Sequence, residues 1–314
     1  MYKRQISGLF PSAGMTIILY ALMSFGVAGI GLSIQHDANH GAYSTNANVN
    51  KYLGKLLNLV GGFASAWKIQ HNVLHHTYTN ILHYDEDISP IGGVLRFSPN
   101  DELNKIHKFQ HIYAWFLYGL MTFMWVTTKD FKQIYRYKKM GLTNTLNQSF
   151  NSIVIELIIS KILYYGYILI IPLMITSAPW WSVVVGIFVM HYVSSLMFGL
   201  TFQPGHIVPE TNFPQPTRDL TIENNWMIHQ LESTSNYAPN NRLFSWFVGG
   251  INFQVEHHLF PNICHVHYRA LSQIIKETAK EYDVPYYSHN SFLSALKYHS
   301  KMLKSLGRET QAAA

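Results

Sequence analysis

The sequence predicts an all-α integral membrane protein, and three observations support that fold class. Of the 314 residues, 48% are hydrophobic and only 13% are charged, which is about half the charged share usual in soluble domains. Three long segments are nearly free of charge, and each is long enough to cross a bilayer core of about 30 Å as a helix. The chain also has 20 Tyr and 7 Trp, whose amphipathic rings favour membrane interfaces.

The first predicted span covers residues 15–34, which include no charged side chain. A cleaved signal peptide is the alternative, because Lys3 and Arg4 precede this apolar run. However, the run is longer than the roughly 7–15 residues of a signal-peptide core. A histidine-rich segment also follows directly, where a cleavage site would be needed. We therefore expect a membrane helix.

Residues 150–176 and 179–202 are the second and third predicted spans, and Pro179 lies in the turn that makes them a hairpin. The second span carries Glu156 and Lys161. A charged group at the bilayer centre costs roughly 2.5–3.5 kcal/mol on insertion scales. These two side chains should therefore lie near an end of the span, face the helix bundle or pair with another charge.

The other segments predict interfacial helices and a polar cap. Residues 41–70 interleave lysine with leucine, which suits a helix lying in the interface. Residues 112–126 are apolar but short, and residues 203–314 read as a C-terminal cap. Neither a repeat nor a linker divides the chain, so we expect a single domain over residues 1–314. The helices predicted within the cap are 268–282 and 291–306.

Histidines cluster in three short windows, HDANH, HNVLHH and QVEHH. On a helix, residues four apart project from one face, and Gln254 would point the same way as His257. Imidazole suits Fe, Cu and Zn, whereas Mg and Ca prefer oxygen. Local structural roles would explain any one of these histidines, but they explain seven in three windows poorly. We therefore expect the seven rings to surround a pair of metal ions. They are His36, His40, His71, His75, His76, His257 and His258.

Span parity places the three windows on one side of the membrane. Only 30 residues separate His40 from His71, whereas two crossings would need about 40 helical residues. The two later spans return the chain to the same face before the third window, provided that residues 112–126 lie in the interface or re-enter. A cluster of basic residues then falls on this face, which the positive-inside tendency makes cytoplasmic. These residues are Lys129, Lys132, Arg136, Lys138 and Lys139.

At these windows the sequence resembles the integral-membrane fatty acid desaturases, and the resemblance covers nearly the whole chain. QVEHHLFP, with Gln254 in place of a first histidine, is similar to front-end enzymes such as Δ6 and Δ5 desaturases. HNVLHHTYTN followed by DED resembles bacterial linoleoyl-CoA-desaturase-like members. The resemblance implies a di-iron centre that uses O₂ to remove two hydrogens from an acyl chain. It carries over the seven histidines as ligands and adds His206, which follows the last span.

Further residues around these windows are expected to support the metals. Gln254 would ligate or hold water, and His229 would line the site. Four acids are candidate acceptors for ligand N–H groups, a contact that fixes the imidazole tautomer; a solvated charged loop is the alternative for them. His191, in the third span, is expected to be packed and hydrogen-bonded rather than a ligand. The four acids are Asp37, Asp85, Asp87 and Glu256.

The chain departs from the family pattern in two places. The second window has one residue more than the common H-x₂-HH form, which on an α-helix would rotate His71 by about 100°. The family also has a two-span hairpin before the first window, and this chain has room for one span. That would leave Lys3 and Arg4 outside, against the positive-inside tendency. We hypothesise that the N-terminus is incomplete.

The resemblance implies O₂-dependent desaturation of a long-chain acyl-CoA or acyl-lipid, with front-end Δ6 action on an unsaturated C18 chain. The chain contains no HPGG heme motif, so a separate donor, ferredoxin or cytochrome b5, is expected to supply electrons. The expected location is a bilayer, the bacterial inner membrane, and no nucleic-acid-binding pattern is present. Two alternatives stay open: a hydroxylase with the same metal site, and a non-catalytic membrane metal carrier. A carrier needs polar residues along its spans, and these spans offer only Glu156, Lys161 and His191.

Overall fold

The computed structural model describes residues 12–89, 91–222 and 224–308. It contains three helical stretches long and apolar enough to cross a membrane, Ala13–Asn39, Phe150–Ile175 and Trp180–Gly205. They coincide with the three predicted spans, and the mostly helical structure is consistent with the predicted membrane class. The first and third run a few residues further than predicted, to Asn39 and Gly205. Lys3 and Arg4, and with them the hypothesis of an incomplete N-terminus, lie outside the described residues.

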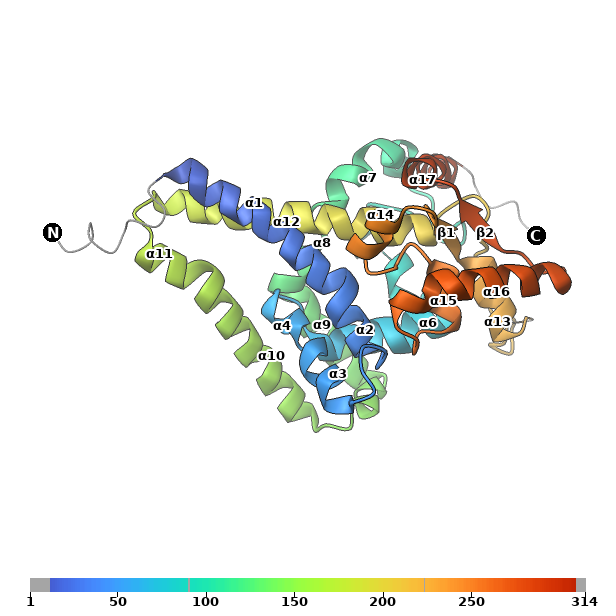
Figure 1. The fold of residues 1–314 in the computed structure, drawn as a ribbon, viewed down its shortest axis with the longest axis horizontal. Coiled ribbons are helices and arrows are strands. Elements are labelled where there is room, and N and C mark those ends of the chain that lie inside the picture. The colour runs from blue at the N-terminus through green and yellow to red at the C-terminus, as the bar shows by residue number, and fades with distance from the viewer. Residues whose placement is uncertain (1–11, 90, 223, 309–314) are drawn as a thin grey trace.

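The first and third spans lie side by side, and the second diverges from them (Figure 1). α1 (Ala13–Gly29) passes through the π-helical segment η3 (Ile30–Ile34) into α2 (Gln35–Asn39), and α12 (Trp180–Phe202) packs along it. The approach is close at Gly31, where a Cβ would lie 2.4 Å from Cζ of Phe198. The second span consists of α10 (Phe150–Tyr165), η10 (Gly166–Ile170) and α11 (Ile171–Ile175).

Short helices occupy the region between the diverging spans. Residues 41–70 form three helices rather than one interfacial helix, and a sharp turn at Gly61 and Gly62 separates the last two. Gly61 has φ +93°, and a Cβ there would lie 2.6 Å from Cγ1 of Val126, so tertiary packing requires a break that lysine–leucine spacing does not reveal. Residues 112–126 divide between two short helices and form no candidate span in the described chain. The elements of this region are α3 (Ala47–Gly54), α4 (Leu56–Leu59), α5 (Ala64–Trp67), α7 (Gln110–Tyr118), α8 (Met121–Met124), η8 (Trp125–Lys129) and α9 (Asp130–Lys139).

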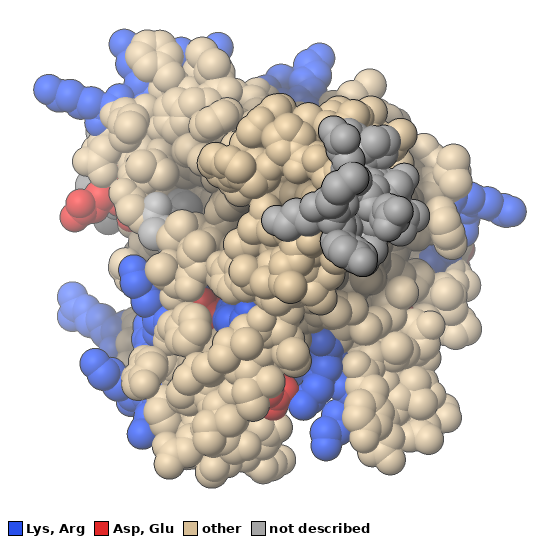
Figure 2. Space-filling model, turned by 90° about the vertical axis from the view of Figure 1, so that its left-hand side faces the viewer, with Lys and Arg blue, Asp and Glu red and all other residues tan. Residues whose placement is uncertain are grey.

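The two charges of the second span are both paired, as expected. Lys161 Nζ lies 2.6 Å from Asp130 Oδ2 and also donates to the carbonyl oxygens of Gly61 and Trp125. Glu156 lies 2.8 Å from Lys55. The outward faces of the spans are apolar, with exposed side chains such as Leu22, Ile162 and Met174. At the end of the molecule where α11 lies, the described side chains in view are largely uncharged, and Lys and Arg gather at the margins (Figure 2).

The C-terminal region forms a cap over the α12 end that is remote from α11 (Figure 1). The predicted amphipathic helices are present as α16 (Tyr268–Glu281) and α17 (Phe292–Leu306). Two three-residue parallel strands depart from the all-α expectation: β1 (Ser235–Tyr237) pairs with β2 (Tyr287–His289), Ser235 opposite Tyr287. The remaining cap helices are α13 (Trp226–Ser233), α14 (Arg242–Phe247), α15 (Gln254–Leu259) and η12 (His265–His267). Elsewhere lie η4 (Lys68–His75), α6 (His76–Tyr78), η5 (Glu86–Ile88), η6 (Ile91–Gly93), η7 (Lys105–Phe109), η9 (Leu142–Leu146) and η11 (Gln203–Gly205).

Candidate metal centre

The second histidine window is π-helical, and this accounts for its extra residue. η4 ends at His75, and the backbone N–H of His76 donates to the carbonyl of His71, an i→i+5 hydrogen bond. A π-helical turn contains more residues than an α-helical turn. The additional residue therefore does not rotate His71 away from its neighbours. His71 Nε2 lies 3.2 Å from His36 Nε2 and 3.3 Å from His76 Nε2.

The eight predicted histidines lie together in overlapping groups. In each group the ring nitrogens lie within 4.8 Å of one another. We call His36, His40, His71 and His257 the first group, and His75, His206 and His258 the second group. His76 lies between them, grouped with His257 and His258. Seven of the eight side chains are buried, and His40 is half-buried.

Four segments supply these rings, and each places them where helical structure ends or changes. His36 and His40 lie at the end of the first span, in and just after α2. His206 follows η11 at the end of the third span, and the second window runs from η4 into α6. α15 brings His257 and His258 from the cap. The site is therefore built where the ends of two spans meet the cap.

Burial keeps most of these rings neutral. Desolvation lowers the pKa of His71, His76, His257 and His258 well below the usual value, and repulsion from neighbouring imidazoles adds to that effect. Burial likewise lowers the pKa of His206 to about 3. Neutral imidazole is the form that binds a metal ion. The electrostatics thus favour the ligand form.

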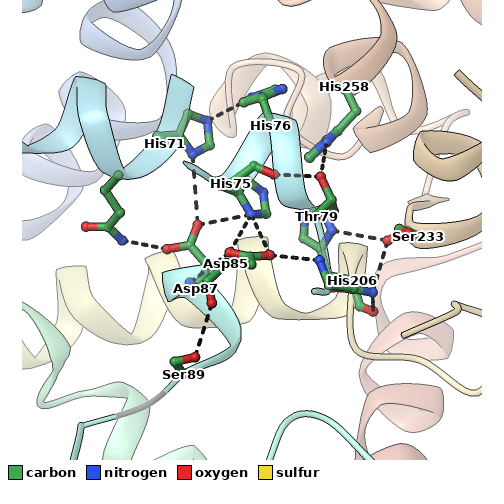
Figure 3. Close-up of polar contacts among 12 residues, drawn as sticks. His71, His75, His76, Thr79, Asp85, Asp87, Ser89, His206, Ser233 and His258 are labelled. Carbon is green, nitrogen blue, oxygen red and sulfur yellow. Dashed lines mark hydrogen bonds and ion pairs between the residues drawn. The ribbon is translucent and has the colours of Figure 1, made fainter. Parts of the chain in front are cut away.

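His75 is the exception because two acids face it (Figure 3). Burial lowers its pKa, but the charges of Asp85 and Asp87 outweigh that effect and raise the pKa to about 9. His75 Nδ1 lies 3.0 Å from Asp85 Oδ2 and 3.5 Å from Asp87 Oδ2. Asp85 is fully buried. These two acids therefore contact a histidine of the second window, as the sequence predicted.

Other Nδ1 atoms have acceptors that the sequence did not indicate. His258 Nδ1 lies 2.8 Å from Gln230 Oε1, and His206 Nδ1 lies 3.3 Å from the carbonyl of Ser233. His257 Nδ1 lies 3.3 Å from the hydroxyl of Tyr268. Such contacts hold Nδ1 and leave Nε2 free for a metal. The one feature of the sequence that could have pointed to Gln230 was its position beside His229. His229 itself is buried but belongs to none of the metal-type groups found among the described residues.

Asp37 and Glu256 form hydrogen bonds with other residues around the site rather than with an imidazole ring of the three histidine windows. Asp37 Oδ2 lies 2.7 Å from His265 Nδ1 and 3.0 Å from Cys264 Sγ. Glu256 accepts hydrogen bonds from Asn236 and Tyr286 in the cap. Asp37 directly follows His36 and Glu256 directly precedes His257, and adjacent side chains on a helix diverge by about 100°. The expectation that these two acids accept from ligand N–H groups is therefore wrong for the described contacts of both.

Gln254 has the inward position expected of it. Its Oε1 lies 3.1 Å from His206 Nε2, and its Nε2 has no hydrogen-bond partner among the described residues. Gly205 permits this contact, because a Cβ there would lie 2.5 Å from Cγ of Gln254. The amide therefore faces the same space as the ring of His206.

The donor set fits metal ions of the kind that imidazole binds. Nε2 of His76 lies 3.0 Å from Nε2 of His257, which in turn lies 3.4 Å from Nε2 of His71. In addition, the buried Nε2 atoms of His40 and His258 have no hydrogen-bond partner in the described chain. Unsatisfied buried polar atoms cost about 1–3 kcal/mol each. Converging neutral nitrogens of this kind are satisfied by cations such as Fe or Zn.

Comparison with known proteins finds one family model and several relatives that agree with one another. The family model for fatty acid desaturases matches residues 11–290. The sn-1 linoleoyl-lipid 6-desaturase of Arthrospira platensis is 34% identical over 304 residues, covering 95% of this chain and 80% of the relative. The enzyme of the same name from Synechocystis sp. is 35% identical over 293 residues, covering 91% and 79%. The acyl-lipid (8-3)-desaturase of Physcomitrium patens is 33% identical over 308 residues, covering 95% and 62%.

Proposed function

Because the chain belongs to the fatty acid desaturase family, we propose that it is a di-iron front-end enzyme that forms a Δ6 double bond in an unsaturated C18 acyl chain. As a family member it is an integral membrane oxidoreductase that desaturates fatty acyl chains in lipid biosynthesis. The observation that carries the di-iron proposal is the division of eight histidines into two groups with His76 between them.

In this proposal the first group holds one iron ion and the second group holds the other. His76 completes the set between them, and Gln254 either ligates or holds a water at the second position. Asp85 and Asp87 orient His75 from outside the metal sphere. The ligands proposed are His36, His40, His71, His75, His76, His206, His257 and His258.

The overall reaction takes two hydrogens from adjacent carbons of the acyl chain. Together with O₂, two electrons and two protons, it yields a carbon–carbon double bond and two waters. Iron bound here would supply the capacity to activate O₂ and accept electrons. Apart from His75, the chain itself provides neutral imidazoles, because burial opposes their protonation. The same burial keeps bulk water away from the reacting carbons.

The substrate assignment is supported by the relatives and by one motif. The two linoleoyl-lipid 6-desaturases are named for action on an acyl-lipid at position 6, which supports an acyl-lipid over an acyl-CoA. Gln254 opens a QVEHH window typical of front-end enzymes, and it contacts the ring of His206. The reading of a Δ6 front-end enzyme follows from these two points together.

Electron supply and orientation complete the proposal. A separate donor, ferredoxin or cytochrome b5, is proposed as the source of the two electrons. The metal centre and cap are assigned to the cytoplasmic face, since α9, which carries Lys132 and Arg136, packs through Ile134 against Ile69 and Leu74 of η4, the helix of the second histidine window. A bacterial inner membrane is the proposed location.

Expression in a host that lacks polyunsaturated fats, with added linoleate and a compatible donor, tests this function. Gas chromatography with mass spectrometry should find a new double bond between the existing bonds and the carboxyl end. His36→Ala should abolish the product, whereas His267→Ala, at an exposed position, should retain it. A product that gains oxygen would indicate a hydroxylase. Bound metal without O₂ consumption would indicate a carrier, and an unchanged lipid profile with iron and donor present would contradict the proposal.

A further inference from the structure

The three rings of the second group depend on one two-residue segment, Thr79 and Asn80. Both residues are completely buried and directly follow α6. Neither was singled out by the histidine pattern. Each contacts the groups that hold the Nδ1 atoms of the second group. Figure 3 shows Thr79 joined to the ring of His258 and to His75.

Asn80 reaches His75 through Asp85. The backbone N–H of Asn80 donates to Asp85 Oδ2 over 2.9 Å, and the same oxygen lies 3.0 Å from His75 Nδ1. Asn80 has φ +60°, a left-handed conformation that asparagine and glycine tolerate best. The unusual backbone therefore aims this N–H at the carboxylate that orients His75.

The side chain of Asn80 reaches His206 in two ways. Its Nδ2 lies 3.1 Å from the carbonyl oxygen of His206 and 3.4 Å from that of Ser233. The Ser233 carbonyl also lies 3.3 Å from His206 Nδ1. A further contact of 3.1 Å links Nδ2 to the carbonyl of Asn212. One amide thus fixes both the backbone of His206 and the acceptor of its ring.

Thr79 makes the corresponding contact to His258. Its Oγ1 lies 2.9 Å from Gln230 Oε1 and 3.3 Å from His258 Nδ1. Gln230 Oε1 is the acceptor 2.8 Å from His258 Nδ1. The same hydroxyl lies 2.7 Å from the carbonyl of His75. It therefore ties the second window to the ring of His258.

The first group has different support. Among the described residues, no hydrogen bond links Thr79 or Asn80 to a ring of the first group, and the Nδ1 atom of His36 has no partner. The acceptor of His257 Nδ1 is Tyr268, on α16. Asp87 is shared, since its Oδ2 lies 3.9 Å from His71 Nδ1 and 3.5 Å from His75 Nδ1. The contacts of Thr79 and Asn80, by contrast, go to the second group and its acceptors.

We propose that Thr79 and Asn80 are positioning residues for one of the two metal ions, the one held by His75, His206 and His258. This inference rests on the proposed di-iron function. Loss of partners outside the metal sphere lowers metal affinity by about 10–100-fold. Changes at Thr79 or Asn80 should therefore weaken one metal ion and leave the ion of the first group in place.

Two variants separate the two contacts. Thr79→Val keeps the shape of the side chain and removes the hydroxyl. Asn80→Gly permits the positive φ and the backbone N–H while removing the amide. Thr79→Ser, which retains a hydroxyl, should restore the wild-type behaviour. Asn147 provides the matched control, because it is an exposed asparagine with φ +52°, and Asn147→Gly should behave as wild type.

The experiment is Fe²⁺ titration of the purified full-length protein after chelator treatment, with metal content per chain measured by mass spectrometry. The wild type should bind two ions. Thr79→Val and Asn80→Gly should bind one with unchanged affinity and the other about 10–100-fold more weakly. Mössbauer spectra of ⁵⁷Fe-loaded samples should then lose one iron signal and retain the other.

Other results would reject either the di-iron function or the positioning role of Thr79 and Asn80. A wild-type protein that binds fewer than two ions would reject the di-iron function itself. If the wild type binds two, then equal weakening of both ions, or no weakening, overturns the positioning role. The same conclusion follows if Asn147→Gly shows the same loss, or if circular dichroism finds both Thr79→Val and Asn80→Gly unfolded, since the segment would then be only structural.

Discussion

Asp85 Oδ2 lies 3.0 Å from His75 Nδ1, and both side chains are buried. The carboxylate also accepts hydrogen bonds from the backbone N–H groups of Asn80 and Asp87. It therefore has a fixed orientation before any metal binds. It is the acidic acceptor closest to a ring of the three histidine windows.

Asp85→Asn should lower iron affinity by about 10–100-fold, because a neutral amide replaces the charged acceptor that orients His75. The pKa of His75, raised to about 9 by its acids, should fall in the metal-free variant. Iron retention after gel filtration measures the first effect. Asp283→Asn, at an exposed position, is the control, and equal retention in both variants would contradict the role of Asp85.

Lys161→Met should destabilise the protein by about 3–5 kcal/mol, because it leaves Asp130 as an unpaired buried charge. The pair joins the second span to α9 with a separation of 2.6 Å. The double variant Lys161→Met with Asp130→Leu should recover most of this loss. Denaturant unfolding in detergent provides the measurement, and a double variant as unstable as the single one would show that packing matters more than charge.

Gly249→Ala should displace the segment that precedes the first histidine window. Gly249 has φ +59°, and a Cβ there would lie 2.5 Å from Cα of Ser33 and 2.6 Å from the carbonyl oxygen of Leu32. Gly141→Ala is the matched control, since Gly141 also has positive φ but open space around it. Gly141→Ala should be destabilised only by the cost of a left-handed backbone conformation, about 1–2 kcal/mol. Gly249→Ala should melt lower than Gly141→Ala and hold iron less tightly; equal melting temperatures would contradict the packing argument.

His299 should make stability fall as the medium becomes acidic. Burial lowers its pKa to about 4, and its ring lies between the Tyr118 hydroxyl and the Ile207 carbonyl. The unfolded chain takes up a proton below pH 6.5, whereas the folded chain resists protonation down to about pH 4. The stability present above pH 6.5 is therefore lost across this window, by about 2 kcal/mol between pH 7 and pH 5.

His299→Gln isolates that contribution, because glutamine keeps a donor and an acceptor but does not titrate. The free energy of unfolding is compared at pH 7 and pH 5 in both proteins. The wild type should lose about 2 kcal/mol more than the variant over this interval. Equal losses in the two proteins would assign the acid sensitivity to other groups.

The positions of the spans followed from composition because a bilayer imposes a length and a polarity on any helix that crosses it. The breaks between the short helices of residues 41–70 could not be predicted from composition, since they depend on contacts with residues far away in the chain. Gly61 turns the chain where Val126 and Tyr164 leave no room for a Cβ. For Lys161 the sequence predicted only that a buried charge would have a partner, because the cost of desolvation requires one. It did not indicate that the partner is Asp130.

The sequence by itself indicated which histidines belong together, through their clustering in three windows and through the family resemblance that added His206. Only the tertiary structure decided how they are held. The π-helical form of η4 keeps His71 beside His36. The assignment of Asp37 to His265, of Gln230 to His258 and of Asn80 to His206 likewise depends on contacts between segments far apart in the chain. Such contacts leave no periodic signal, so the clustering of the histidines could be read from the sequence, whereas the residues that orient them, Asp85 and Asp87 apart, could not.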